Sequence, residues 1–327
     1  RKSTIKILNI SDNSLADKGA CCLADLIYNS HSLVSVDLGS NHITDEGTKI
    51  IFTALKTNKH IVHLSIGGIS SIGRNIIGPN AAQEIANCLQ ENKVISELNF
   101  SMTELNSSTT KIISQGLVNN HCLTHLDLSR NNIRSSGAIS IFKSLSHSSI
   151  VELKLACNHI GDDVSPNFVV FLAKNPKLRV IDLSANDLGF RFMNSLANSA
   201  ISSTVEELIL SKNPLGGRGI SAFGPYLAQN SSIRILNVNS CQIDCNGFAE
   251  FCLNLQRSQS LEILQVQHNP LTDEGIAKLA IALNYCKSLR ELDLENVEMT
   301  DPGVYKLFPA LNQTKISVLS VKNNLIH

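Results

Sequence analysis

The stretch Leu123-Thr-His-Leu126-Asp-Leu128-Ser-Arg-Asn131-Asn-Ile133 decides the fold of this chain. Leu126 and Leu128 alternate with polar residues, and a period of two predicts a short strand with one buried face. Asn131 follows the strand, where its side chain can hydrogen-bond the backbone of the turn. The stretch Leu33-Val-Ser-Val36-Asp-Leu38-Gly-Ser-Asn41-His-Ile43 has the same order of residue types.

This pattern recurs along the whole chain. Its first apolar position falls at residues 5, 33, 61, 95, 123, 150, 178, 205, 233, 261, 289 and 316. The gaps between starts are 27 or 28 residues, with one exception of 34. A fixed period of this length predicts a repeat solenoid, whose core grows along one axis.

The second half of each repeat predicts a helix. In the stretch Leu271-Thr-Asp-Glu-Gly-Ile-Ala-Lys-Leu-Ala-Ile-Ala-Leu283, apolar residues recur at helical spacing. Thr272 or Asp273 is expected to cap this helix, and Glu274 favours its first turn because a carboxylate opposes the helix dipole there. Helices are wider than strands, so stacked units are expected to curve around a parallel sheet.

An asparagine recurs at the turn after each predicted strand. A stacked column of such side chains can satisfy backbone groups that water does not reach. Cys241 takes this place in one repeat, and the repeats around Thr103 and Val297 lack the asparagine. The predicted column consists of Asn13, Asn41, Asn131, Asn158, Asn186, Asn213, Asn269 and Asn324.

These repeats resemble the ribonuclease-inhibitor-like class of leucine-rich repeats, and the resemblance covers essentially the whole chain. It implies an α/β leucine-rich repeat solenoid of about 12 repeats, a right-handed horseshoe with the parallel sheet on its concave face and helices on its convex face. We expect residues 1–327 to form a single domain excerpted from a longer chain. The class includes protein inhibitors, ends of innate-immune receptors, the GTPase-activating protein of Ran, and cytoskeletal and ciliary scaffolds.

Composition limits the functions that this chain can have. Lys plus Arg and Asp plus Glu each total 28, so there is no basic surplus of the kind that nucleic-acid binding requires. The nine cysteines include no CxxC pair, which favours reduced thiols such as Cys88 and Cys252 in a cytoplasmic protein. Cys241 and Cys245 lack a second pair that would complete a metal site.

No predicted feature indicates an enzyme. The chain has no phosphate-binding loop, nucleophile elbow or apolar run long enough to cross a membrane. We therefore expect no catalytic residue, cofactor or metal, and no nucleic-acid, membrane or small-molecule partner. The expected partner is a protein.

Acidic residues dominate the positions that point outward from the predicted sheet, since these alternate with the buried ones. Nine carboxylates stand there against Lys154 and Lys322, so a partner with a basic surface would be attracted. Aspartate is also common at this position in this repeat class without a role in binding, and that alternative stays open. The partner-binding carboxylates that we predict are Asp37, Glu97, Asp127, Glu152, Asp182 and Asp293.

Aromatic anchors are missing from these outward positions. Tight interfaces usually centre on Trp, Tyr or Arg, and this chain has no Trp. Their absence favours binding through an edge, a loop or the helical face over a tight concave clamp.

The gap of 34 residues marks an insertion. Counting back from Ile95 puts Asn75 in the register of Asn41, so six extra residues must lie within Gly67–Arg74. Loops on rigid scaffolds often carry function, and Arg74 is the residue that we predict is presented to a partner there. In the Ran relatives a rim arginine has been discussed as a catalytic finger, but the residues around Arg74 do not reproduce that pattern.

The leading interpretation is a cytoplasmic protein-interaction scaffold, within a cytoskeletal or ciliary assembly by analogy. Two alternatives remain: a GTPase-activating protein of the Ran regulator type, and the sensor region of a larger innate-immune-like receptor.

Overall fold

The computed structural model describes residues 4–68, 72–199 and 203–327. Its contacts divide the chain into two compact units, residues 1–159 and 160–327. In both units short strands alternate with helices, which confirms the predicted α/β leucine-rich repeat solenoid. Among the described residues, no helix has the length and apolar character needed to cross a membrane.

The first unit contains six strands and five helices in its described part. Its strands are β1 (Ile7–Asn9), β2 (Ser35–Asp37), β3 (His63–Ser65), β4 (Glu97–Asn99), β5 (His125–Asp127) and β6 (Glu152–Lys154). Its helices are α1 (Ala16–Asn29), α2 (Asp45–Leu55), α3 (Pro79–Glu91), α4 (Ser107–Leu117) and α5 (Arg134–Ser144).

The second unit repeats this alternation. Its strands are β7 (Val180–Asp182), β8 (Glu207–Ile209), β9 (Ile235–Asn237), β10 (Ile263–Gln265), β11 (Glu291–Asp293) and β12 (Val318–Ser320). Its helices are α6 (Ser165–Lys174), α7 (Phe190–Ala197), α8 (Gly216–Gln229), α9 (Cys245–Leu255), α10 (Thr272–Leu283) and α11 (Asp301–Leu311), and a 3-10 turn, Asp162–Val164, precedes α6.

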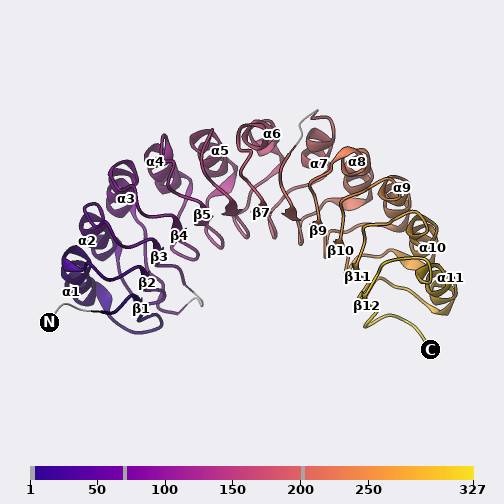
Figure 1. The fold of residues 1–327 in the computed structure, drawn as a ribbon, viewed down its shortest axis with the longest axis horizontal. Coiled ribbons are helices and arrows are strands. Elements are labelled where there is room, and N and C mark those ends of the chain that lie inside the picture. The colour runs from indigo at the N-terminus through magenta and orange to yellow at the C-terminus, as the bar shows by residue number, and fades with distance from the viewer. Residues whose placement is uncertain (1–3, 69–71, 200–202) are drawn as a thin grey trace. The chain divides into compact units, whose positions relative to one another are not determined.

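Within each unit the strands pair in parallel and in sequence order, without crossovers. Val36 pairs with Leu64 and Leu208 with Leu236, so the central residue of each strand faces the core. Figure 1 shows the strands of each unit lining one side and its helices covering the other. The core between these layers is mainly Leu and Ile, with buried phenylalanines on the helix side.

The predicted asparagine column is confirmed, and it joins neighbouring repeats. Asn131 Oδ1 accepts the backbone N–H groups of Thr103 and Leu105, both at 3.0 Å. Its Nδ2 donates to the carbonyls of Phe100 and Leu128, both at 2.9 Å. It also donates to the Ser129 carbonyl at 3.2 Å, so one buried amide satisfies five backbone groups in two repeats. Cys241 substitutes with its thiol, which donates to the Leu210 carbonyl at 3.2 Å.

A second asparagine column, which the sequence analysis missed, lies where the helices lead into the strands. Asn92 Oδ1 accepts the N–H groups of Val94 and Ile95, and its Nδ2 donates to the Leu55 carbonyl at 2.7 Å. Asn58 and Asn120 make the equivalent contacts. The sequence pattern that indicates this second column is an asparagine three residues before the first apolar position of a repeat.

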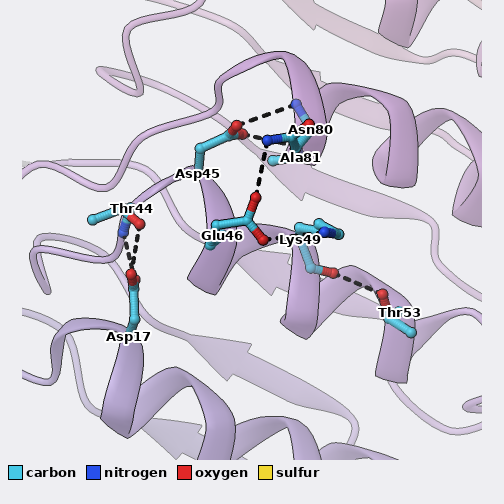
Figure 2. A network of polar contacts seen from close by, with 8 residues as sticks. All are labelled: Asp17, Thr44, Asp45, Glu46, Lys49, Thr53, Asn80 and Ala81. Atoms are coloured by element: carbon cyan, nitrogen blue, oxygen red, sulfur yellow. Dashed lines mark hydrogen bonds and ion pairs between the residues drawn. The ribbon is translucent and has the colours of Figure 1, made fainter.

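Aspartates in the first helical turn link consecutive helices. Asp17 accepts the Thr44 N–H at 2.8 Å and its hydroxyl at 2.6 Å, and Asp45 accepts the N–H groups of Asn80 and Ala81 (Figure 2). Each carboxylate thus satisfies donors at the start of the following helix, where backbone N–H groups have no intrahelical partner.

The expectation that Thr272 or Asp273 caps its own helix is wrong. Leu271 precedes α10 without a side-chain cap, and Asp273 accepts the N–H of Thr300 at 2.8 Å and its hydroxyl at 2.5 Å. Burial acts to raise the pKa of Asp273, but the Thr300 and Gly303 hydrogen bonds and the charge of Lys306 outweigh burial and lower that pKa. Asp273 therefore stabilises the next helix.

Acid should weaken this link. A carboxyl whose pKa is lowered on folding stabilises the protein above its unfolded pKa of about 4 and loses that contribution as pH falls through the folded value. We expect Asp273→Asn to lower Tm at pH 6, and the difference from wild type to shrink steadily below pH about 4. Thermal unfolding from pH 6 to 2.5 measures this. The exposed Asp163→Asn serves as the control, and a difference independent of pH would contradict the assignment.

The predicted register of the insertion is confirmed by Asn75. Its Oδ1 accepts the N–H groups of Asn41 and Ile43, and its Nδ2 donates to the carbonyls of Leu38 and Ile66. Asn75 is fully buried and occupies the column position of its repeat. Residues 69–71 of the insertion lie outside the described residues. Near its end, Gly73 has a φ of 74°, and its carbonyl accepts a hydrogen bond from the His42 N–H.

Candidate functional site

The outward strand positions of the first unit form one continuous surface. The register aligns Asp37, Ser65, Asn99, Asp127 and Lys154 in one column. It aligns Ser35, His63, Glu97, His125 and Glu152 in the other. Together they line a shallow hollow of about 340 Å³. The structure thus brings four of the predicted carboxylates together: Asp37, Glu97, Asp127 and Glu152.

The aspartates of this surface also have a structural role. Asp37 Oδ1 accepts the N–H of Gly39 at 3.0 Å, and Asp127 Oδ1 accepts that of Ser129 at 2.8 Å. Asn99, in the same column, makes the equivalent bond to Ser101 N at 2.9 Å. Because an uncharged amide does this as well as a carboxylate, the turn does not require the charge.

The glutamates lie next to basic side chains. Glu97 Oε2 is 2.7 Å from His63 Nδ1, and Glu97 Oε1 is 3.8 Å from His125 Nδ1. Glu152 Oε1 is 2.5 Å from Lys154 Nζ. These contacts hold the glutamates on the sheet surface, and the hollow has four carboxylates and one lysine among its lining residues.

The other two predicted carboxylates, Asp182 and Asp293, lie on the sheet of the second unit. Asp182 Oδ1 accepts the N–H of Ser184 at 2.8 Å. Asp293 Oδ1 accepts the N–H of Glu295 at 3.1 Å, and its Oδ2 accepts a hydrogen bond from Gln267 Nε2. Asp293 is therefore more fully engaged within the protein than Asp37 and Asp127, which each accept one hydrogen bond.

Arg74 lies at the end of the insertion, next to the buried Asn75. The residue is half-buried, and its Nε is buried without a hydrogen-bond partner in the described residues. Arg74 is thus less extended into solvent than a fully presented rim side chain. Its proposed contact with a partner and its proposed role as a catalytic finger both stay predictions.

The nine cysteines differ in burial, and Cys122 and Cys245 are half-buried. Cys88, Cys241, Cys252 and Cys286 are buried, whereas Cys21, Cys22 and Cys157 are exposed. Burial raises the pKa of Cys88 and of Cys241 to about 12, so these thiols stay protonated. Within the described ranges, no group of three or more His, Cys, Asp or Glu side chains is placed to hold a metal ion.

Known proteins share this repeat. The Leucine Rich repeat family model matches residues 1–24, 29–49, 119–142, 146–163, 202–224, 257–280 and 285–308. Human NACHT, LRR and PYD domains-containing protein 14 is 26% identical over 58% of this chain and 17% of its own length. Pig ribonuclease inhibitor is 26% identical over 55% of this chain and 39% of its own length. The chain thus spans well under half of either relative.

Solved structures agree on the fold. A crystal structure of an internalin from Listeria monocytogenes covers 97% of this chain and is itself covered to 82%, with a TM-score of 0.56 and 16% identity. At that identity the likeness shows the fold alone. Since the repeat, the alternation of strands and helices, the family match and the relatives all agree, the chain is a ribonuclease-inhibitor-like leucine-rich repeat protein.

Proposed function

We propose that this protein is a protein-interaction scaffold, and that the hollow of the first unit binds a basic segment of a partner protein. The observation that supports it is the convergence of Asp37, Glu97, Asp127 and Glu152 on one hollow. Surface charge of one sign speeds the encounter with a partner of opposite charge and favours it over acidic competitors. Arg74, on the same unit, is proposed as a second contact at the rim.

The setting of this scaffold is a finer proposal. Its place in the cytoplasm, within a cytoskeletal or ciliary assembly, rests on analogy with other leucine-rich repeat scaffolds. The scaffold role itself needs no catalytic residue, because a rigid repeat array can bind through its surface alone.

Neutralising the hollow should weaken binding of a cationic probe. The variant combines Asp37→Asn, Asp127→Asn, Glu97→Gln and Glu152→Gln, which remove the charges and keep hydrogen-bond acceptors in place. We expect affinity for a fluorescent oligolysine peptide to fall about tenfold at low salt, since each exposed charge contributes less than about 1 kcal/mol. Fluorescence anisotropy over a salt series measures the change.

The control removes as many negative charges from elsewhere on the first unit: Asp12→Asn, Asp25→Asn, Glu91→Gln and Glu104→Gln. At 0.15 M salt, where the Debye length is about 8 Å, it should leave affinity within about twofold, because these side chains do not line the hollow. Equal losses in both variants would mean that only net charge matters, and the proposal would fail. Arg74→Gln in the neutralised background tests the rim contact by pull-down of a partner identified with the wild-type protein.

A second candidate is the leucine-rich repeat region of a larger receptor. The similarity to NACHT, LRR and PYD domains-containing proteins favours it, because the chain matches only 17% to 26% of the length of several of them. Sequencing the transcript upstream of residue 1 tests it. A nucleotide-binding domain encoded there would support this candidate, and an unrelated domain would exclude it.

A further inference from the structure

The helical face of the second unit carries a row of exposed apolar side chains. Pro225, Leu253, Ile281 and Pro309 stand at the same position of four consecutive repeats, 20 residues after the first apolar residue. They lie on α8, α9, α10 and α11, which follow one another on the outer side of this unit (Figure 1). Leu253 is 60% exposed and Ile281 is 56% exposed.

The first unit has polar residues at the same position. Asp25, Thr53, Gln115 and Lys143 stand 20 residues after the starts of their repeats, and all are exposed. The position therefore does not need an apolar side chain, because α1, α2, α4 and α5 form with polar residues there. The apolar row of the second unit, Pro225–Leu253–Ile281–Pro309, requires another explanation. Contiguous exposed apolar surface commonly marks an interaction site.

A groove lies along this row, between α10 and α11. Its volume is about 570 Å³, and the residues that line it include Ala277, Ala280, Ala310, Ile281, Pro309 and Lys306. Three alanines leave room between the helices for the side chain of another molecule. The flat surface of a membrane would leave this recess unfilled, whereas a side chain of a protein ligand can fill it. The groove therefore favours a protein ligand over a bilayer.

The charge around the α10–α11 part of the apolar row is basic, whereas on α9 the exposed Glu250 lies one turn before Leu253 and accepts a hydrogen bond from Ser221. Residues 251–259, 276–287 and 304–315 contain no Asp or Glu. They contain Arg257, Lys278, Lys287, Lys306 and Lys315, all of them exposed. The α10–α11 part of the row therefore favours a ligand that combines an apolar side with acidic flanks, which is the reverse of the ligand proposed for the hollow of the first unit.

We propose that the helical face of the second unit binds an acidic amphipathic helix of a partner protein. The helix lies along the apolar row and inserts one large apolar side chain into the α10–α11 groove, while its carboxylates meet Lys278 and Lys306. Neighbouring helices pack roughly 8–10 Å apart, so a row across four of them is about 30 Å long and matches about 20 residues of helix. Binding through one helical face is a recurrent mode of peptide recognition.

The probe is a fluorescent peptide of about 18 residues, roughly 27 Å of helix, made of Leu, Ala and Glu with all leucines on one face. We expect the full chain to bind it in fluorescence anisotropy. Ile281→Glu should lower the affinity at least about tenfold, because it places a charge in the apolar row. Lys306→Glu should lower it about threefold or more and reduce its dependence on salt.

Matched controls lie on the first unit. Thr53→Glu changes the position equivalent to Ile281, and Lys111→Glu reverses an exposed charge on α4; both should bind the probe like wild type. Circular dichroism of all four variants establishes that they are folded. A peptide with Lys in place of Glu, and a peptide with the residue order scrambled, should bind at least about tenfold more weakly.

Three outcomes would overturn the proposal. The first is that the acidic peptide does not bind, and the second is that Ile281→Glu and Thr53→Glu reduce its binding equally. The third is that the chain binds vesicles of phosphatidylcholine and phosphatidylserine but does not bind the peptide. The last result would reassign the surface to anionic membranes. None of these results bears on the hollow of the first unit, whose probe has the opposite charge.

Discussion

Replacing Asn75 by leucine is expected to lower the free energy of unfolding by about 4 kcal/mol or more. The Asn75 side chain makes four hydrogen bonds to buried backbone groups: two N–H groups at 3.0 and 3.1 Å, and two carbonyls at 2.8 and 2.9 Å. Leucine has a similar size but satisfies none of them. Each buried group left without a partner costs about 1–3 kcal/mol.

The control is Asn13→Leu, in the same column. Asn13 is exposed, and its Nδ2 bonds only to the Ile10 and Ser11 carbonyls, so the expected loss is below about 1 kcal/mol. Urea unfolding followed by circular dichroism measures both, and amide hydrogen exchange of Asn41 and Ile43 reports the local effect if the repeats unfold separately. Equal losses in the two variants would show that the column does not stabilise the stack.

Gly247→Ala is expected to destabilise the second unit by about 3 kcal/mol. Gly247 lies in the first turns of α9, and a Cβ there would overlap the Cα, C and O atoms of Gly217 in α8. Backbone atoms cannot rotate out of the way as a flexible side chain can, so the two helices must separate. Separation would also expose apolar core that α8 and α9 share.

Gly219→Ala, in α8, provides the matched comparison. A Cβ at residue 219 meets Leu215 Cβ at 3.4 Å and Met193 Cγ at 3.5 Å, which is ordinary contact. Alanine also favours a helix over glycine, so this variant should be unchanged or more stable by about 0.5–1 kcal/mol. Thermal and urea unfolding distinguish the two. A stable Gly247→Ala protein would show that α8 and α9 can move apart at little cost.

The two proposed ligands have opposite charge and bind different layers of different units. The hollow of the first unit has an acidic sheet surface, and the apolar row of the second unit has basic flanks. The two proposed surfaces have no residue in common. The formal charge of the whole chain is zero and therefore gives no sign that acidic and basic residues gather on different surfaces.

Much of the fold could be predicted from the period of the sequence. Because Leu126 and Leu128 recur with the repeat, they identified the buried face of the strand, and the outward columns followed from simple alternation. The same counting placed Asn75 in its column despite the insertion. These predictions depend only on the distance along the chain, which a repeat converts directly into position.

The role of Asp273 could not be predicted in this way. Counting puts Asp273 in the first turn of α10, but its carboxylate bonds to Thr300 of the next repeat. Likewise, simple alternation placed Glu97 on the outward face, and only the structure shows its Oε2 2.7 Å from Nδ1 of His63. Contacts between repeats depend on side-chain conformation and on the local geometry of the turns, which the period does not specify.

The sequence by itself therefore determined the repeat, its twelve starts and the residues that face inward and outward, because hydrophobic burial at fixed spacing leaves one arrangement for them. Only the tertiary structure decided how neighbouring repeats are joined and where their surfaces are hollowed. The Asp273 bridge, the second asparagine column and the groove beside Ile281 all arise between repeats, where atoms from two distant stretches of chain meet.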